Sequence, residues 1–239
     1  MARALRIQAA GLTYHVWARG SGRMAIYLDE QDRLQFLELL GQALVSHNAV
    51  CHGFCEMTNH YHLVITTNEP NLSHTIHEVN FRYAQWWNRQ HSRPGHVLQG
   101  RFGAQIVQDK SYLLSVCRYV VLNPVRAGLV RSPNEWKWSS YRATAGLEDV
   151  PPFLSPQTLW DRLGGKKAEA KWRRYREFVC TGGDGVPAPP CEPVLGDEMF
   201  VQRFKDHRAA ARREVPARFR RARPPLTNLL ARVFTAGDR

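Results

Sequence analysis

The order in which strand-like and helix-like segments follow one another is the feature that most limits how this chain can fold. Along residues 11–122 the period of the apolar side chains indicates the order β-α-β-β-α-β-α. Strands that alternate with helices, with one hairpin between them, form a sheet with helices packed on it. The order predicts an α+β fold: a ferredoxin-like antiparallel sheet (βαββαβ) with an added C-terminal helix.

Turn and cap residues set the expected bounds of these segments. The four expected strands are residues 11–18, 49–57, 60–66 and 99–107. The three expected helices are residues 29–47, 71–90 and 109–122. Thr58-Asn59 is short enough to join the middle strands as a hairpin. We expect the third helix to end near Asn123, because Pro124 follows and the residue before a proline disfavours the α region.

Composition divides the chain into three parts. Residues 1–145 are expected to form one domain, closed by a short helix and aromatic packing at 130–145. Residues 146–192 are rich in proline and glycine and are expected to be a linker with a short basic helical stretch. Residues 193–239 are a basic C-terminal segment, one interpretation of which is a shortened helix-turn-helix.

The net charge of +12 favours a polyanionic partner. From residue 201 onward eleven Lys and Arg stand against three Asp and Glu, so the tail carries most of this excess. The N-terminus lacks the apolar run of a signal peptide, and no stretch is long and apolar enough to span a membrane. The five scattered cysteines suit reduced thiols better than a disulfide framework. We therefore expect a cytoplasmic, nucleoid-associated protein with no membrane partner.

His60, Tyr61 and His62 form the sharpest chemical pattern. Side chains two residues apart on a strand point to the same face, so both imidazoles can bind one divalent cation. A His-x-His pattern is also common by chance, so two structural histidines are the alternative.

Tyr119 and Asn123 lie four residues apart near the end of the third expected helix, which places them on one helix face. A phenol can serve as a nucleophile, and an amide oxygen can complete a metal shell. A core tyrosine with Asn123 as a helix C-terminal residue is the alternative. The other tyrosines are expected to serve in packing or in DNA stacking; they include Tyr14, Tyr61, Tyr83, Tyr112 and Tyr141.

Four longer motifs, two of which contain these residues, follow one another along the chain. They are MTNHYHLVIT (57–66), GHVLQGRF (95–102), RYVVLNPVRAGLV (118–130) and WKWSSYR (136–142). Together with GLTYHVWARG (11–20), they resemble the REP-associated single-tyrosine transposases. These are IS200-like members of the HUH nuclease superfamily, named for its His-hydrophobic-His motif. The resemblance covers about residues 5–145.

The resemblance implies a ferredoxin-like fold in which His60 and His62 bind the catalytic metal, with Asn123 as the third ligand. It implies that Tyr119 is the nucleophile and forms a 5′-phosphotyrosine link to DNA. It favours Mg²⁺ or Mn²⁺ as the cofactor, although two imidazoles would also suit zinc. The implied partner is single-stranded hairpin DNA with REP-like repeats, bound by a monomer or a homodimer.

Five further residues are candidates for DNA binding because basic and aromatic side chains recognise phosphates and bases. These residues are Arg82, Trp86, Arg89, Arg93 and Arg101. For Arg82 and Arg89 a solvated helix face is the alternative. Two other functions remain open at this point: a non-catalytic, domesticated DNA-binding protein, and an RNA-binding or RNA-cleaving protein.

Overall fold

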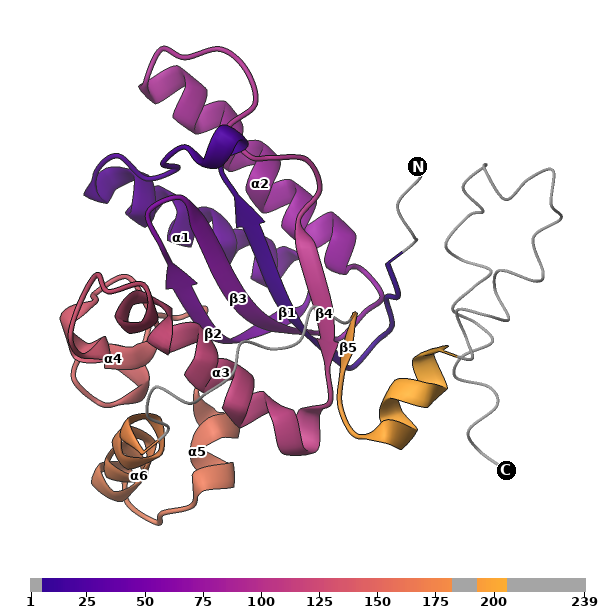
Figure 1. Cartoon of the computed structure of the whole chain (residues 1–239), viewed down its shortest axis with the longest axis vertical. Helices are drawn as coiled ribbons and strands as arrows, with labels where there is room; N and C mark the ends of the chain where they lie inside the picture. Colours follow the sequence, from indigo (N-terminus) through magenta and orange to yellow (C-terminus); the bar gives the residue numbers. More distant parts are fainter. Residues whose placement is uncertain (1–5, 182–192, 206–239) are drawn as a thin grey trace, which may run out of the picture.

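The computed structural model describes residues 6–181 and 193–205, which surround a central five-stranded sheet (Figure 1). The strands are β1 (Leu12–Arg19), β2 (Ala49–Glu56), β3 (His60–Thr67), β4 (Gly103–Val107) and β5 (Val194–Leu195). Their order across the sheet is β2-β3-β1-β4-β5. The first four strands pair antiparallel, and β5 pairs parallel with β4. This arrangement confirms the predicted α+β fold with a ferredoxin-like sheet.

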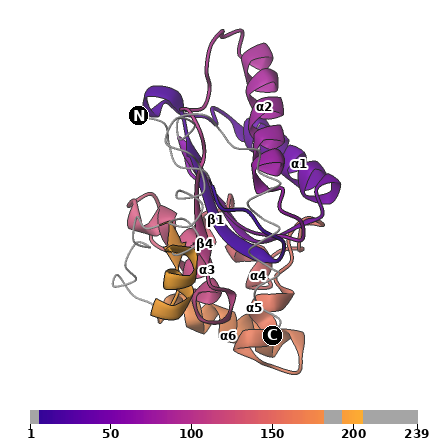
Figure 2. The same ribbon diagram turned by 90° about the vertical axis from the view of Figure 1, so that its right-hand side faces the viewer.

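Helices cover both faces of the sheet (Figures 1 and 2). α1 (Glu30–Ser46) and α2 (Leu72–Gln90) lie on one face, and α3 (Asp109–Arg126) lies on the other. The alternation of side chains along β1 explains this layering. Tyr14 and Val16 are buried against the α1 and α2 side, whereas His15 and Trp17 lie on the α3 side. The α3 face is therefore the one on which the strands carry their polar and imidazole groups.

The prediction that the third helix ends near Asn123 is wrong, because α3 continues through Pro124 to Arg126. Pro124 has no N–H to donate to the carbonyl of Val120, one turn earlier. The Asn123 side chain supplies the missing donor, since its Nδ2 donates to the carbonyl oxygens of Val120 (3.2 Å) and Tyr119 (3.0 Å).

The helix is terminated by Gly128, two residues after Arg126, which takes a left-handed conformation with φ of 69°. The Gly128 N–H donates to the Val125 carbonyl, and the Leu129 N–H donates to the Pro124 carbonyl. These two bonds form a Schellman motif, a common way to satisfy the last carbonyls of a helix. Gly128, rather than Pro124, therefore terminates the helix.

We expect Asn123→Ala to lower the free energy of unfolding by about 1 kcal/mol, because the Val120 carbonyl loses its donor. In a Pro124→Ala background the backbone N–H returns, and the same substitution should cost less. Urea denaturation of the four proteins in this cycle measures the coupling. An equal cost in both backgrounds would show that Asn123 does not replace the missing N–H.

The chain after α3 packs along β2, at the edge of the sheet, and against α3. The short 3-10 helix η2 (Pro133–Glu135) and α4 (Tyr141–Thr144) close the domain. The Arg33 guanidinium lies over the rings of Trp136 and Trp138, which confirms the aromatic packing predicted for residues 130–145.

α5 (Gln157–Leu163) and α6 (Ala168–Cys180) continue this layer, and they bury Leu159, Tyr175 and Val179 beside α3. Residues 157–180 of the predicted linker are therefore packed helices, of which α6 is the expected basic stretch. The glycine- and proline-rich residues 182–192 and the basic tail 206–239 lie outside the described residues. Of the predicted C-terminal segment, β5 extends the sheet edge, and Phe204 is buried.

Candidate active site

His60 and His62 lie at the start of β3, on the face of the sheet that α3 covers. Their ring centroids are 5.1 Å apart. The strand places both imidazoles on one face, as the spacing predicts, because neighbouring side chains on a strand alternate. His62 is almost fully buried and His60 is half-buried.

Tyr119 of α3 lies against this pair, although it is 57 residues away from His62 in the sequence. Its ring centroid is 6.0 Å from that of His62 and 5.8 Å from that of His15 on β1. The Tyr119 side chain is half-buried rather than enclosed in the core. The guanidinium of Arg126 lies 5.0 Å from the centre of its ring. The structure thus brings a phenol, two imidazoles and a guanidinium together.

Each imidazole uses its Nδ1 for a fixed partner. The Nδ1 of His60 lies 2.7 Å from the Asn59 Oδ1, and the Nδ1 of His62 lies 2.9 Å from the Nε2 of His15. Metal-binding histidines commonly use one nitrogen for a cation and the other for such an orienting partner. The pair therefore fits a divalent cation bound through Nε2.

The remaining ligand atoms for a cation would come from elsewhere. Within residues 6–181 and 193–205 no cluster of three or more His, Cys, Asp or Glu is arranged to hold a metal. That set of residue types does not include asparagine. Asn123, one turn after Tyr119 on α3, carries an amide oxygen that can also bind a metal ion. Its amide nitrogen bonds the helix carbonyls, so its oxygen is the side-chain atom that would serve as a ligand.

The histidines of the site favour the neutral form. Burial, with the charge of Arg19, lowers the pKa of His60 to about 4. Burial lowers the pKa of His15 to about 4 as well, although a hydrogen bond with Gln105 opposes it. Burial and the nearby His15, His60 and Arg19 lower the pKa of His62 well below its ordinary value. Neutral imidazoles are the form that binds metal ions.

These shifts predict that acid destabilises the metal-free protein. Between pH 6.5 and about 4 these histidines bind protons in the unfolded chain but stay neutral in the folded protein. Their contribution to the free energy of unfolding is therefore fully present above pH 6.5 and is lost as the pH falls. Each such histidine contributes a slope of up to about 1.4 kcal/mol per pH unit. Urea denaturation in EDTA across this range should show a shallower slope for His15→Gln. The exposed His74→Gln is the control, and an unchanged slope in His15→Gln would contradict the prediction.

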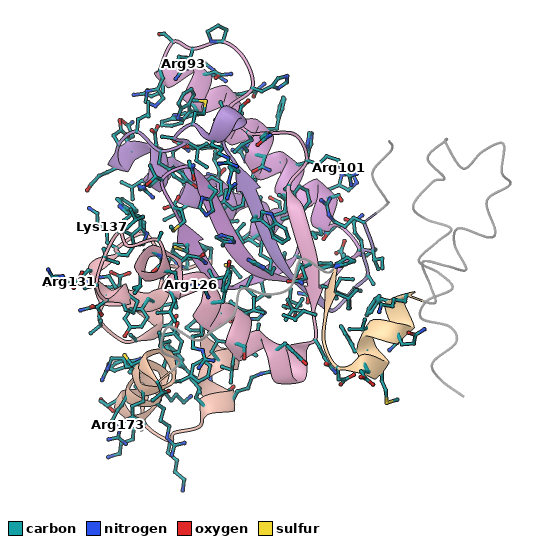
Figure 3. The ribbon with its side chains drawn as sticks, in the orientation of Figure 1. Arg93, Arg101, Arg126, Arg131, Lys137 and Arg173 are labelled. Atoms are coloured by element: carbon teal, nitrogen blue, oxygen red, sulfur yellow. The ribbon has the colours of Figure 1, made fainter. Side chains whose placement is uncertain are left out.

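The five residues predicted to bind DNA are not gathered at this site. Arg82 and Trp86 lie on α2, on the opposite face of the sheet, where Arg82 pairs with Glu78 and Trp86 stacks on Tyr83. Arg89 is exposed near the end of α2. Arg93 and Arg101 are exposed in the segment between α2 and β4, and Figure 3 shows them at separate places. Their DNA-binding roles stay predictions.

Sequence reasoning missed His15, Trp17 and Arg126. No spacing of His15 to another histidine in the sequence indicates a metal site, yet β1 lies directly beside β3 in the sheet. Residues alternating with Tyr14 and Val16 on β1 therefore had to face the histidine pair. Arg126 was missed because the helix was expected to end before it.

Most rival nucleophiles are enclosed in the core. The phenols of Tyr14, Tyr61 and Tyr83 are buried on the α1 and α2 side, and burial raises the pKa of each. Cys51 and Cys55 are also fully buried, and burial raises the pKa of both thiols. Tyr112 remains as a second half-buried tyrosine on α3.

Comparisons with known proteins bear on the family and the fold. The family model described as "Transposase IS200 like" matches residues 8–123. A REP-associated tyrosine transposase, solved bound to a REP hairpin, superposes with a TM-score of 0.54 at 15% identity. That match covers 66% of this chain and 93% of the other.

A tRNA(His) guanylyltransferase from Saccharomyces cerevisiae gives a TM-score of 0.39 at 9% identity, covering 80% of this chain and 87% of the other. The comparison with curated proteins found no match. In the described part of the chain, no helix is both long and apolar enough to cross a membrane. The resemblance noted in the sequence motifs is confirmed, because residues 8–123 match the model of the IS200-like transposase family.

Proposed function

We propose that this protein is a metal-dependent transposase and endonuclease that cleaves and rejoins single-stranded DNA at hairpin-forming sites. The observation that carries the proposal is the convergence of Tyr119 with His60 and His62 on one face of the sheet. A protein that only binds DNA has no physical need for a half-buried phenol beside two neutral imidazoles.

Tyr119 acts as the nucleophile. Its phenol oxygen forms a bond to a DNA phosphorus while the bond from that phosphorus to the 3′-oxygen breaks. The phenol proton is lost, and the departing 3′-oxygen gains a proton, so the step leaves a 5′-phosphotyrosine and a free 3′-OH. The phosphodiester energy is kept in the new link, and a 3′-OH of another strand can reverse the step. No nucleotide hydrolysis is needed.

His60 and His62 would hold a divalent cation, Mg²⁺ or Mn²⁺, with the amide oxygen of Asn123 as the third protein ligand. When bound, such a cation polarises the scissile phosphate and balances charge on the leaving oxygen. His15 orients His62: for His62 to bind through Nε2, its Nδ1 carries the hydrogen and donates to the Nε2 of His15. Arg126, above the Tyr119 ring, places positive charge where a phosphate approaches the phenol.

Hairpin DNA is the proposed substrate class. The similar solved protein was bound to a REP hairpin, and this chain carries a net charge of +12, which suits a polyanion. Single-stranded DNA beside the hairpin leaves a phosphate accessible to a phenol that sits in a half-buried site.

The test is incubation of the purified protein with end-labelled single-stranded DNA that carries a REP-like hairpin, in Mg²⁺ or Mn²⁺, followed by denaturing electrophoresis. We expect a labelled fragment that migrates with the protein and is released by protease. Binding to the hairpin without any covalent species, in either cation, would instead identify a non-catalytic DNA-binding protein.

A further inference from the structure

Trp17 is an exposed aromatic side chain at the edge of the candidate active site. It lies on β1 directly opposite His62 of β3 and Gly103 of β4, so it shares the face that carries the histidine pair. Its ring centroid is 5.1 Å from that of His15. His15 in turn contacts both His62 and Tyr119.

Trp17 is the most exposed of the seven tryptophans. It is 36% exposed, whereas the other six tryptophans are buried or half-buried. Exposed aromatic rings in nucleic-acid-binding proteins serve as platforms on which unpaired bases stack. A ring beside a phosphate-cleaving site is well placed for that use.

Gly103 lets the Trp17 indole lie directly over β4. A Cβ at residue 103 would fall 2.2 Å from the Trp17 Cε2 and 2.5 Å from its Nε1, which no real side chain tolerates. The indole therefore has the backbone of β4 against one side. Glycine at this position leaves the space that the ring occupies.

Positive charge lies next to this ring. Arg19 follows two residues later on β1 and stands opposite His60. Its side chain is exposed, and its charge reaches the site, since it lowers the pKa of both His60 and His62. An aromatic face with a neighbouring guanidinium matches a nucleotide, whose base stacks while its phosphate meets the cation.

We propose that Trp17 and Gly103 form a stacking site for one unpaired nucleobase of the DNA strand, next to the phosphate that Tyr119 attacks. The site requires a single-stranded ligand, because a base within a duplex offers no free face to the ring. It is tolerant of sequence, since every base has a π-face. This inference rests on the proposed function for the identity of the strand.

The first test separates base stacking from phosphate binding. In a Tyr119→Phe background, which prevents covalent capture, the affinity for an oligo(dT) strand is compared with that for an abasic strand of equal length and charge. We expect oligo(dT) to bind more tightly than the abasic strand. Trp17→Ala should weaken oligo(dT) binding by about 5- to 150-fold and leave abasic binding nearly unchanged.

Two variants on this site make the result specific. Trp17→Phe should retain part of the preference for oligo(dT). Gly103→Ala should reduce this preference, because the added methyl group displaces the Trp17 ring. Phe81→Ala, which removes another exposed aromatic on α2, is the matched control and should change nothing. A Trp17→Ala protein that keeps the full preference, or that loses affinity for both strands equally, would overturn the proposal.

A second measurement does not depend on affinity. Photocrosslinking of an oligonucleotide that carries 5-iododeoxyuridine should attach it to the peptide that contains Trp17. Crosslinks that map elsewhere would contradict the stacking site. Neither measurement uses DNA cleavage, so a stacking site without covalent product would refute the transposase chemistry alone, and covalent product without stacking would refute this inference alone.

Discussion

Tyr119→Phe is expected to abolish the covalent protein–DNA product while leaving DNA binding nearly unchanged. The substitution removes one oxygen atom from a half-buried side chain that packs beside His15 and His62. The ring and its contacts remain, so the fold should be preserved. Without the phenol oxygen no 5′-phosphotyrosine can form, and the loss should reach the detection limit of denaturing electrophoresis.

Tyr112→Phe is the matched control, because it is the same substitution in a half-buried position two turns earlier on α3. We expect this variant to form the covalent product at the wild-type rate. A product that survives in Tyr119→Phe but disappears in Tyr112→Phe would transfer the role of nucleophile to Tyr112. A product that survives in both would require a nucleophile other than these two tyrosines.

Loss of the imidazole pair should have the second largest effect. His60→Ala and His62→Ala are each expected to slow cleavage by about a thousandfold or more, since stabilisation of a reacting phosphate by a bound cation is worth several kcal/mol. EDTA should have the same effect on the wild-type protein. Titration of the protein with Mn²⁺, followed by electron paramagnetic resonance, measures the bound cation without reference to activity.

Hairpin binding separates this prediction from misfolding. Both variants should bind hairpin DNA with nearly the wild-type affinity, because the histidines are neutral and contribute little to phosphate attraction. The exposed His74→Ala is the control for histidine replacement and should cleave normally. Cleavage that persists at full rate in EDTA would remove the metal ion from the mechanism and leave Arg126 as the positive charge beside Tyr119.

The ferredoxin-like sheet could be predicted from the chain because local patterns carry most of the information. Apolar periods of two and about 3.6 separate strands from helices, and an Asp29 cap or a two-residue hairpin requires only neighbouring residues. The shared face of His60 and His62 follows for the same reason, since alternation along a strand is a property of the backbone. The end of α3 was predicted wrongly because Pro124 was given more weight than Gly128. The Asn123 side chain compensates for the proline, and that local bond is not evident from the residue types alone.

The sequence by itself determined the order of the elements, the histidine pair on β3 and the family model that residues 8–123 match. Only the tertiary structure decided which other side chains meet that pair. His15 and Trp17 come from β1, and Tyr119 and Arg126 come from α3; their proximity depends on strand order and on the packing of α3 across the sheet. It also placed Arg82 and Trp86 on the opposite face. Contacts between residues far apart in the chain depend on how the layers pack. A pattern within one segment therefore does not show which other segments that segment contacts in the fold.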